Sequence, residues 1–208
     1  MTNVSLIVNL CHTQQTPSSK CSTNFEFMFQ NAFSDALESK KIISLNTYGD
    51  NATWIGFVLA YTSEFVTIEH VSKYGQYDGV ITLKVTDIER VDLDDEMCRS
   101  VNFLYHNTKE FSKLSKTYAN LENDMGDFFS VLSECKEKNL ICSIDTKELY
   151  LSCFVLNIDF EEIHILAIDT HGQKDGECHV KMEDIDYVSV GRLQEIRRLL
   201  LYNIHYRS

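Results

Sequence analysis

The sequence predicts a mainly β protein with flanking helices (α+β), built from two tandem five-stranded barrels, each preceded and followed by a helix. Three observations predict it. An internal duplication aligns residues 41–91 with residues 138–188 at an offset of 97 without a gap, and 14 of the 51 pairs are identical. Each half contains five short strand-like segments, and helical periodicity borders both sets. A period this long indicates two copies of a small domain rather than a solenoid repeat.

The first half begins with the apolar spacing of an amphipathic helix. Its apolar residues are Phe25, Phe29, Ala32, Phe33, Ala36 and Leu37, with Ser22 and Asn24 as candidate caps. Strand-like segments follow at 43–45, 54–61, 65–71, 80–85 and 91–93, before a helix over 96–107. Antiparallel strands this short need closure or a helical cover to hide an apolar face. We therefore expect a closed or nearly closed barrel.

The second half repeats this order after a connecting helix at 110–123. An opening helix starts near Phe128. Strands are expected at 140–144, 149–158, 163–168, 177–182 and 187–190, followed by a closing helix over 192–206. The predicted organisation is an N-terminal leader and linker (1–22), a first barrel repeat (23–107), a helical connector (108–125) and a second barrel repeat (126–208).

Charge and cysteine content restrict the expected surroundings of the chain. Its net charge is -12 and its pI is about 4.9, so its long-range field repels nucleic-acid backbones and acidic membrane surfaces. Seven scattered cysteines without a CxxC pair are typical of a reduced, intracellular protein. We expect no signal peptide and no membrane span, because no apolar run reaches eighteen residues. These features predict a cytoplasmic protein.

The predicted order of elements resembles the Sm-like fold, a variant of the SH3-type barrel. The residues that carry the resemblance are 56–68, 79–84 and the short turn at 86–88, each with a shifted copy in the second half. The resemblance covers about three quarters of the chain, and it implies a strongly bent five-stranded barrel behind an N-terminal helix.

The match to the first Sm signature is structural rather than functional. Gly56, Val58 and Tyr61 stand at the positions that the family uses for its fold. Thr62 and Val66 replace the aspartate and the asparagine that the resemblance would require for a nucleotide pocket. The arginine-glycine pair of the second signature is also missing from both copies. The resemblance therefore implies the scaffold without the RNA pocket of the family.

A loop of sequence Gly-Gln-x-Asp-Gly occurs in both copies, at 75–79 and 172–176. Two interpretations are open. The loops are paired binding loops, or they are hairpin turns in which the glycines supply left-handed backbone. In the binding interpretation the candidate residues are Tyr74, Gln76, Tyr77 and Asp78 in the first copy and His171, Gln173, Lys174 and Asp175 in the second.

No motif predicts catalysis, a metal or a cofactor. Several possible ligands gather in the second copy, namely His164, His171, His179, Cys178 and Asp175, but their spacing matches no known metal site. We therefore expect neither a metal nor a cofactor. The acidic run at 92–96 is interpreted as the first turn of the following helix.

The predicted function is a non-catalytic binding or assembly module that binds a protein partner or associates with itself. Strands four and five are the natural sheet edges, which must be covered or paired. We therefore expect the two linked units to pack on each other with approximate twofold symmetry, or tandem chains to assemble into dimers. One alternative is nucleic-acid binding through Arg192, Arg197 and Arg198, although these charges also suit the end of a helix. A second alternative is an enzyme with its site between the two barrels.

Overall fold

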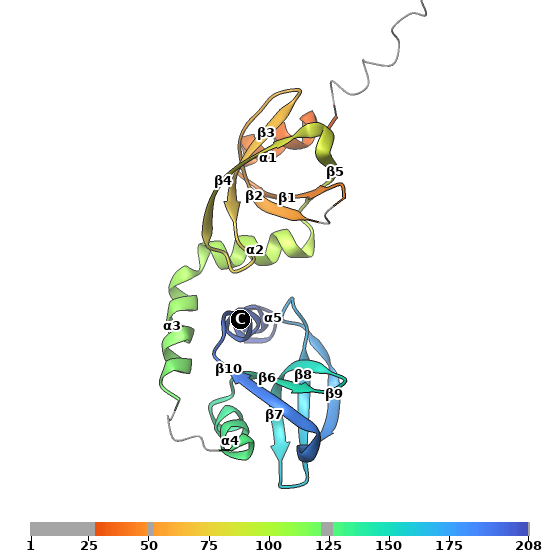
Figure 1. Cartoon of the computed structure of the whole chain (residues 1–208). Helices are drawn as coiled ribbons and strands as arrows, with labels where there is room; N and C mark the ends of the chain where they lie inside the picture. The colour runs from red at the N-terminus through yellow and green to blue at the C-terminus, as the bar shows by residue number, and fades with distance from the viewer. Residues whose placement is uncertain (1–27, 50–51, 122–126, 208) are drawn as a thin grey trace, which may run out of the picture.

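The computed structural model describes residues 28–49, 52–121 and 127–207 (Figure 1). Within these ranges the chain is mainly β with flanking helices, as predicted. The expected leader (1–22), the candidate caps Ser22 and Asn24 and the first residue of the helical stripe, Phe25, lie outside the described residues. None of the helices in the described ranges has the length and the apolar character that a bilayer crossing requires.

The first unit lies in the upper part of Figure 1 and consists of a helix, five strands and a second helix. Its elements are α1 (Gln30–Ser39), β1 (Ile42–Thr47), β2 (Thr53–Tyr61), β3 (Phe65–Val71), β4 (Tyr77–Lys84), the 3-10 turn η1 (Val85–Asp87), β5 (Ile88–Leu93) and α2 (Glu96–His106). The strands form one antiparallel sheet of order β4-β3-β2-β1-β5. Helix α3 (Thr108–Ala119) connects this unit to the second.

The second unit repeats this plan. Its elements are α4 (Phe128–Lys138), β6 (Ile141–Thr146), β7 (Tyr150–Ile158), β8 (Glu162–Ile168), β9 (Lys174–Lys181), the 3-10 turn η2 (Met182–Asp184), β10 (Ile185–Val190) and α5 (Leu193–Arg207). Its sheet order, β10-β6-β7-β8-β9, is that of the first unit. The strand order therefore confirms that one structural unit is present twice.

The two sheets are open, so the expectation of closed barrels is wrong. In the first unit β4 and β5 are joined by η1 but lie at opposite edges of the sheet. The apolar inner face is covered by α1 instead. Phe33 and Ala36 of this helix are buried in one cluster with Leu45, Val66 and Ile68 of the sheet. A helical cover removes the need for strand closure, because it hides the same apolar surface from water.

The repeat also contains a gap that the alignment of the sequence with itself missed. In the first sheet Ile42 pairs with Phe57, and in the second Ile141 pairs with Phe154. The two phenylalanines are 97 positions apart, but the two isoleucines are 99 apart. The hairpin between the first two strands is therefore two residues shorter in the second copy.

The alignment of Ile43 with Leu140 is accordingly wrong, and the structural equivalent of Ile43 is Cys142. Both side chains are buried in the cores of their units. The corrected register adds three identities in the first strand: Ile42 with Ile141, Ser44 with Ser143, and Thr47 with Thr146. The left-handed residues that end α1 and α4, Lys40 and Asn139, also share the 99-residue offset.

Equivalent aromatic residues occupy equivalent surroundings in the two units. The ring of Phe57 packs on that of Tyr105 in α2, with centroids 5.1 Å apart. The ring of Phe154 packs on that of Tyr202 in α5 at 4.7 Å. In both units the closing helix therefore lies against the middle of the second strand.

The connecting helix α3 packs against the second unit. Phe111 and Tyr118 of α3 are buried in one apolar cluster with Ile196 and Leu200 of α5. The Tyr118 hydroxyl donates to the Ile141 carbonyl at 2.9 Å and accepts from the Ile141 amide at 3.1 Å. Burial raises the pKa of Tyr118, so its hydroxyl stays protonated and can donate. Residues 108–119 are therefore part of the packing of the second unit.

We predict that Tyr118→Phe lowers the free energy of unfolding by about 1–3 kcal/mol, because it leaves both backbone groups of a buried strand residue without this partner. Chemical denaturation of the full chain followed by circular dichroism measures the change. The matched variant is Tyr105→Phe, whose hydroxyl donates to Glu69 at a partly exposed site and whose loss costs less. Equal stability of Tyr118→Phe and the unmodified chain would contradict the role given to this hydroxyl.

Candidate functional site

The two Gly-Gln-x-Asp-Gly loops form the same turn. In the first unit the Ser72 amide donates to the Gln76 carbonyl at 2.8 Å, where β3 passes into β4. In the second the Asp169 amide donates to the Gln173 carbonyl at 2.9 Å, between β8 and β9. The loops are thus conserved in backbone geometry as well as in sequence.

The first glycine of each loop packs against the closing helix of its own unit. Gly75 has φ +73°, and a Cβ atom there would lie 2.5 Å from Leu104. Gly172 has φ +79°, and a Cβ atom would lie 2.6 Å from Leu201. Left-handed backbone and close approach both require glycine. These contacts support the structural interpretation of the glycines.

The predicted binding residues differ in exposure and in partners. Gln76, Tyr77, Asp78, Gln173, Lys174 and Asp175 are exposed, whereas Tyr74 and His171 are half-buried. In the second copy these residues contact other helices. Gln173 donates to Glu96 of α2, His171 lies 4.0 Å from the same carboxylate, and the Lys174 ammonium lies over the Tyr206 ring of α5.

The loops converge on Arg197, which is only 6% exposed. Its Nε donates to the Lys73 carbonyl of the first loop at 2.9 Å, and its Nη1 donates to the Thr170 carbonyl of the second. Burial, with a smaller contribution from Arg198, lowers the pKa of Arg197. The junction of the two loops is therefore closed by a packed guanidinium.

This placement bears on the nucleic-acid alternative. Of its three arginines, Arg197 is buried and Arg198 is half-buried, donating to the Asp169 carbonyl at 3.2 Å. Arg192 is exposed at the start of α5. Burial keeps Arg197 from a phosphate, whereas Arg198 uses only one of its five N–H donors in this bond. Arg192 and Arg198 therefore remain available for such a contact.

Each unit contacts the closing helix of the other unit through its Gly-Gln-x-Asp-Gly loop or the residues just before it. The loop of the first unit contacts α5 through Lys73 and Arg197. The loop of the second contacts α2 through Gln173 and Glu96. Helices α2 and α5 also pack on each other, with α2 seen from the side and α5 along its axis in Figure 1. An approximate twofold relation between the units produces reciprocity of this kind.

No known protein family, curated protein or solved structure matches this chain. The Sm-like resemblance therefore stays a prediction, and the candidate sites are judged on geometry alone.

Sequence reasoning missed a buried polar cluster in the second unit. Glu195 of α5 is fully buried, and its Oε1 accepts from Ser143 at 2.6 Å and from Ser189 at 2.9 Å. Ser143 also contacts the Ser152 hydroxyl at 2.8 Å. Cys98 stands at the position of Glu195 in the first unit. Only the fold brings these residues together, since they come from three strands and a helix.

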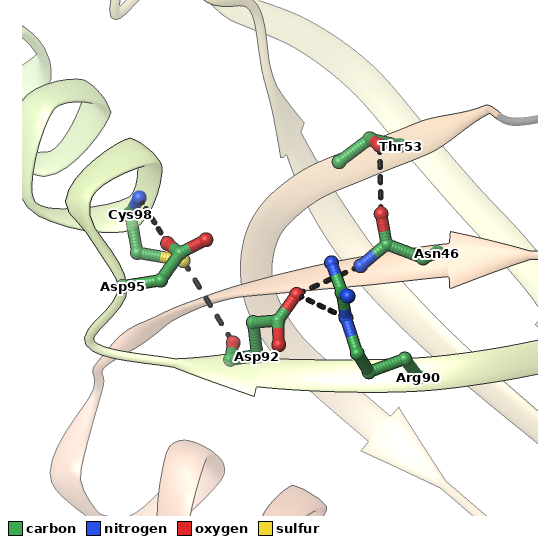
Figure 2. A network of polar contacts seen from close by, with 6 residues as sticks. All are labelled: Asn46, Thr53, Arg90, Asp92, Asp95 and Cys98. Atoms are coloured by element: carbon green, nitrogen blue, oxygen red, sulfur yellow. Dashed lines mark hydrogen bonds and ion pairs between the residues drawn. The ribbon is translucent and has the colours of Figure 1, made fainter. Parts of the chain in front are cut away.

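In the first unit Asp92 stands at the position of Ser189, and with Cys98 it belongs to the polar network in Figure 2. The Asp92 carboxylate of β5 accepts from Asn46 of β1 and from Arg90, each at 2.9 Å. Thr53 of β2 donates in turn to Asn46 at 2.8 Å. The network ties the edge strand β5 to the first two strands, which is a structural role.

The acidic run at 92–96 belongs to the helix start only in part, because Asp92 lies in β5, whereas Asp95 is the N-cap and Glu96 the first residue of α2. The Asp95 carboxylate accepts from the Cys98 amide at 2.7 Å and caps α2 (Figure 2). Burial and then the hydrogen bond to Asp95 raise the pKa of Cys98. A thiol held protonated in this way is a poor nucleophile.

The histidines of the second copy do not form one group. The rings of His164 and His179 stack with centroids 4.3 Å apart, and they contact Glu177 at 3.0 Å and Glu162 at 3.1 Å, respectively. His171 lies elsewhere, beside α2. Within the described residues, no group of three or more histidine, cysteine or acidic side chains has an arrangement able to hold a metal ion.

Two surface hollows lie beside the outer strand of the second sheet. One, of about 420 Å³, lies between the β6–β7 hairpin and η2, where Leu149, Val180 and Asp186 contribute to its wall. The other, of about 440 Å³, is lined by residues of the β7–β8 turn and of β9 and η2, namely Phe160, Glu161, Glu162, Lys181 and Glu183. They share Lys181 and Glu183 and so adjoin each other.

We predict that Gly75→Ala destabilises the chain by roughly 2–4 kcal/mol, because the added methyl group both strains the backbone and overlaps Leu104. Gly79→Ala is the matched control. Gly79 also has a positive φ, +93°, but nothing lies within 4 Å of an added Cβ, so only the backbone cost of about 1 kcal/mol applies. Urea denaturation of both variants measures the difference, and equal losses would refute the close approach.

Proposed function

We propose that the protein is a non-catalytic binding or assembly module whose open sheet edges pair with a strand of another chain. One observation carries the proposal. Each sheet ends in two strands, β4 and β5 or β9 and β10, that have a hydrogen-bonded neighbour on one side only among the described residues. Unpaired strand edges of this kind are templates for pairing with a further strand.

Among these edges, β4 is the best suited to pairing. Its central residues, 80–83, carry no charge, and Val80 and Tyr77 are 56% and 63% exposed. The equivalent strand β9 presents Glu177, His179 and Lys181, and such charges protect an edge from association. Strand β5 contacts α1, which restricts access to it.

The ends of β4 favour a second copy of this chain as the partner. Asp78 stands near the start of the strand and Lys84 at its end, and both are exposed. Antiparallel pairing of β4 with β4 of another copy, centred on Ile81, places Asp78 of each chain opposite Lys84 of the other. Opposite charges across a strand pair stabilise it, and like charges destabilise it.

The environment of the chain supports a protein partner in the cytoplasm. Cys98, Cys135, Cys142 and Cys153 are buried free thiols, as expected in a reducing compartment. The net charge of -12 opposes binding to a polyanion. The Sm-like architecture is part of the same proposal, supported by the strand order and by the helix that precedes each sheet.

We predict that the full chain dimerises and that Lys84→Glu weakens the dimer about tenfold or more, since it places two carboxylates opposite each other at both ends of the strand pair. The double variant Asp78→Lys with Lys84→Glu restores the opposite charges and the dimer. Sedimentation velocity over a range of concentrations measures the dissociation constants.

Lys181→Glu in β9 is the matched control, and its dimer constant stays within about twofold of the unmodified chain. A monomer at all accessible concentrations would sink the proposal of a second copy. A dimer that Lys84→Glu leaves intact would exclude β4 as the interface.

A further inference from the structure

The β7–β8 turn holds an aromatic side chain out in solvent. The Asp159 carboxylate accepts from the amides of Glu161 and Glu162, each at 2.9 Å, and these bonds lower the pKa of Asp159. The Asp159 amide donates to the Glu162 carbonyl at 3.0 Å. Phe160, at the tip of this closed turn, is 84% exposed. Because the side chain of Phe160 stays in water, folding gains almost no hydrophobic stabilisation from it.

The ring of Phe160 is also in contact with a second aromatic ring. It stacks on the ring of Phe129 in α4, with centroids 4.7 Å apart and an interplanar angle of 11°. Phe128, the neighbouring residue of α4, is exposed as well. Stacking on Phe129 already restricts the rotamers of Phe160. A ligand that covers the ring therefore costs less side-chain conformational entropy.

The first unit shows that the turn does not need the phenylalanine. Thr62 stands at the position of Asp159, and its Oγ1 accepts from the amides of Glu64 and Phe65 at 3.2 and 3.0 Å. The residue at the tip is Ser63. Since the same turn forms with a serine at its tip, the hairpin does not require a phenylalanine at position 160.

A surface hollow with mostly acidic lining residues adjoins Phe160. The 440 Å³ hollow beside it is lined by Glu161, Glu162, Glu183 and Lys181. Lys181, the one basic residue of this lining, lies 3.6 Å from Glu183, and His179 lies 3.1 Å from Glu162. Three carboxylates thus face one lysine within the lining. The hollow therefore offers an apolar ring with an excess of carboxylates around it.

We infer that Phe160 and this hollow form a docking site for a segment of a partner protein that carries an aromatic or large aliphatic residue next to lysine or arginine. Apolar contact with the two stacked rings anchors the segment, and the carboxylates pair with its basic residues. Phosphate backbones and anionic lipids are repelled by the same carboxylates. The site goes beyond the proposed strand pairing, because it uses a hairpin tip instead of the edge of β4.

The test is selection of a phage-displayed library of random twelve-residue peptides on the full-length protein. We expect the selected peptides to share an aromatic or large aliphatic residue beside lysine or arginine. Phe160→Ser, which copies the first unit, reduces the affinity of a selected synthetic peptide roughly tenfold or more. Glu161→Lys weakens it as well, and added salt reduces the affinity for the unmodified protein.

Tyr48→Ser, at an exposed hairpin of the first unit, is the matched control and leaves the affinity within about twofold. Unchanged affinity in Phe160→Ser overturns the inference, and so does a library without a shared motif or with an acidic one. Binding of an oligothymidylate or of phosphatidylserine vesicles that Phe160→Ser abolishes would also overturn it, by assigning the site to another class of ligand. Circular dichroism confirms the fold of each variant, and the Lys84→Glu dimer assay is independent of all these outcomes.

Discussion

Burial of helix α5 on several sides is the constraint on which the rest of the structure depends. One side packs on the second sheet through Phe154 and Ile168, another on α3 through Phe111, and a third faces α2 through Leu104. A helix surrounded in this way needs apolar residues around most of its circumference, as the run Leu199, Leu200 and Leu201 supplies. The polar residues that it does bury, Glu195 and Arg197, each bind at least two partners.

Duplication explains both the likeness and the differences of the two units. Each unit keeps the features that form the sheet and dock its closing helix, such as the glycine at 75 or 172 and the aromatic pair across the second strand. Elsewhere the second copy has diverged. It buries a glutamate where the first has Cys98, places a buried arginine where the first has Ser100, and presents Phe160 where the first has Ser63.

The two copies differ in their buried polar residues and in the residues exposed on their edge strands. Both Glu195 and Arg197 are buried in the second copy. Glu195 binds serines of its own sheet, whereas Arg197 binds the Lys73 carbonyl of the first unit and so links α5 to that unit. The first copy keeps the less protected edge strand β4, because its exposed positions there are Val80 and Thr82 instead of Glu177 and His179.

By itself the sequence determined the α+β class, the duplication and the order of the elements, because strand and helix periods follow from which side chains must leave water. It also predicted the helix start near Asp95 from its acidic residues. The two-residue gap before β2 escaped it, since one chance identity, Lys41 with Lys138, and the apolar match of Ile43 with Leu140 extended the alignment without a gap. The tertiary structure alone decided that the sheets stay open, that α3 packs on α5, that Arg197 and Glu195 are buried, and that Phe160 is exposed. Most of these features depend on contacts between residues far apart in the chain, such as Lys73 with Arg197. The local sequence does not show which distant residues come into contact.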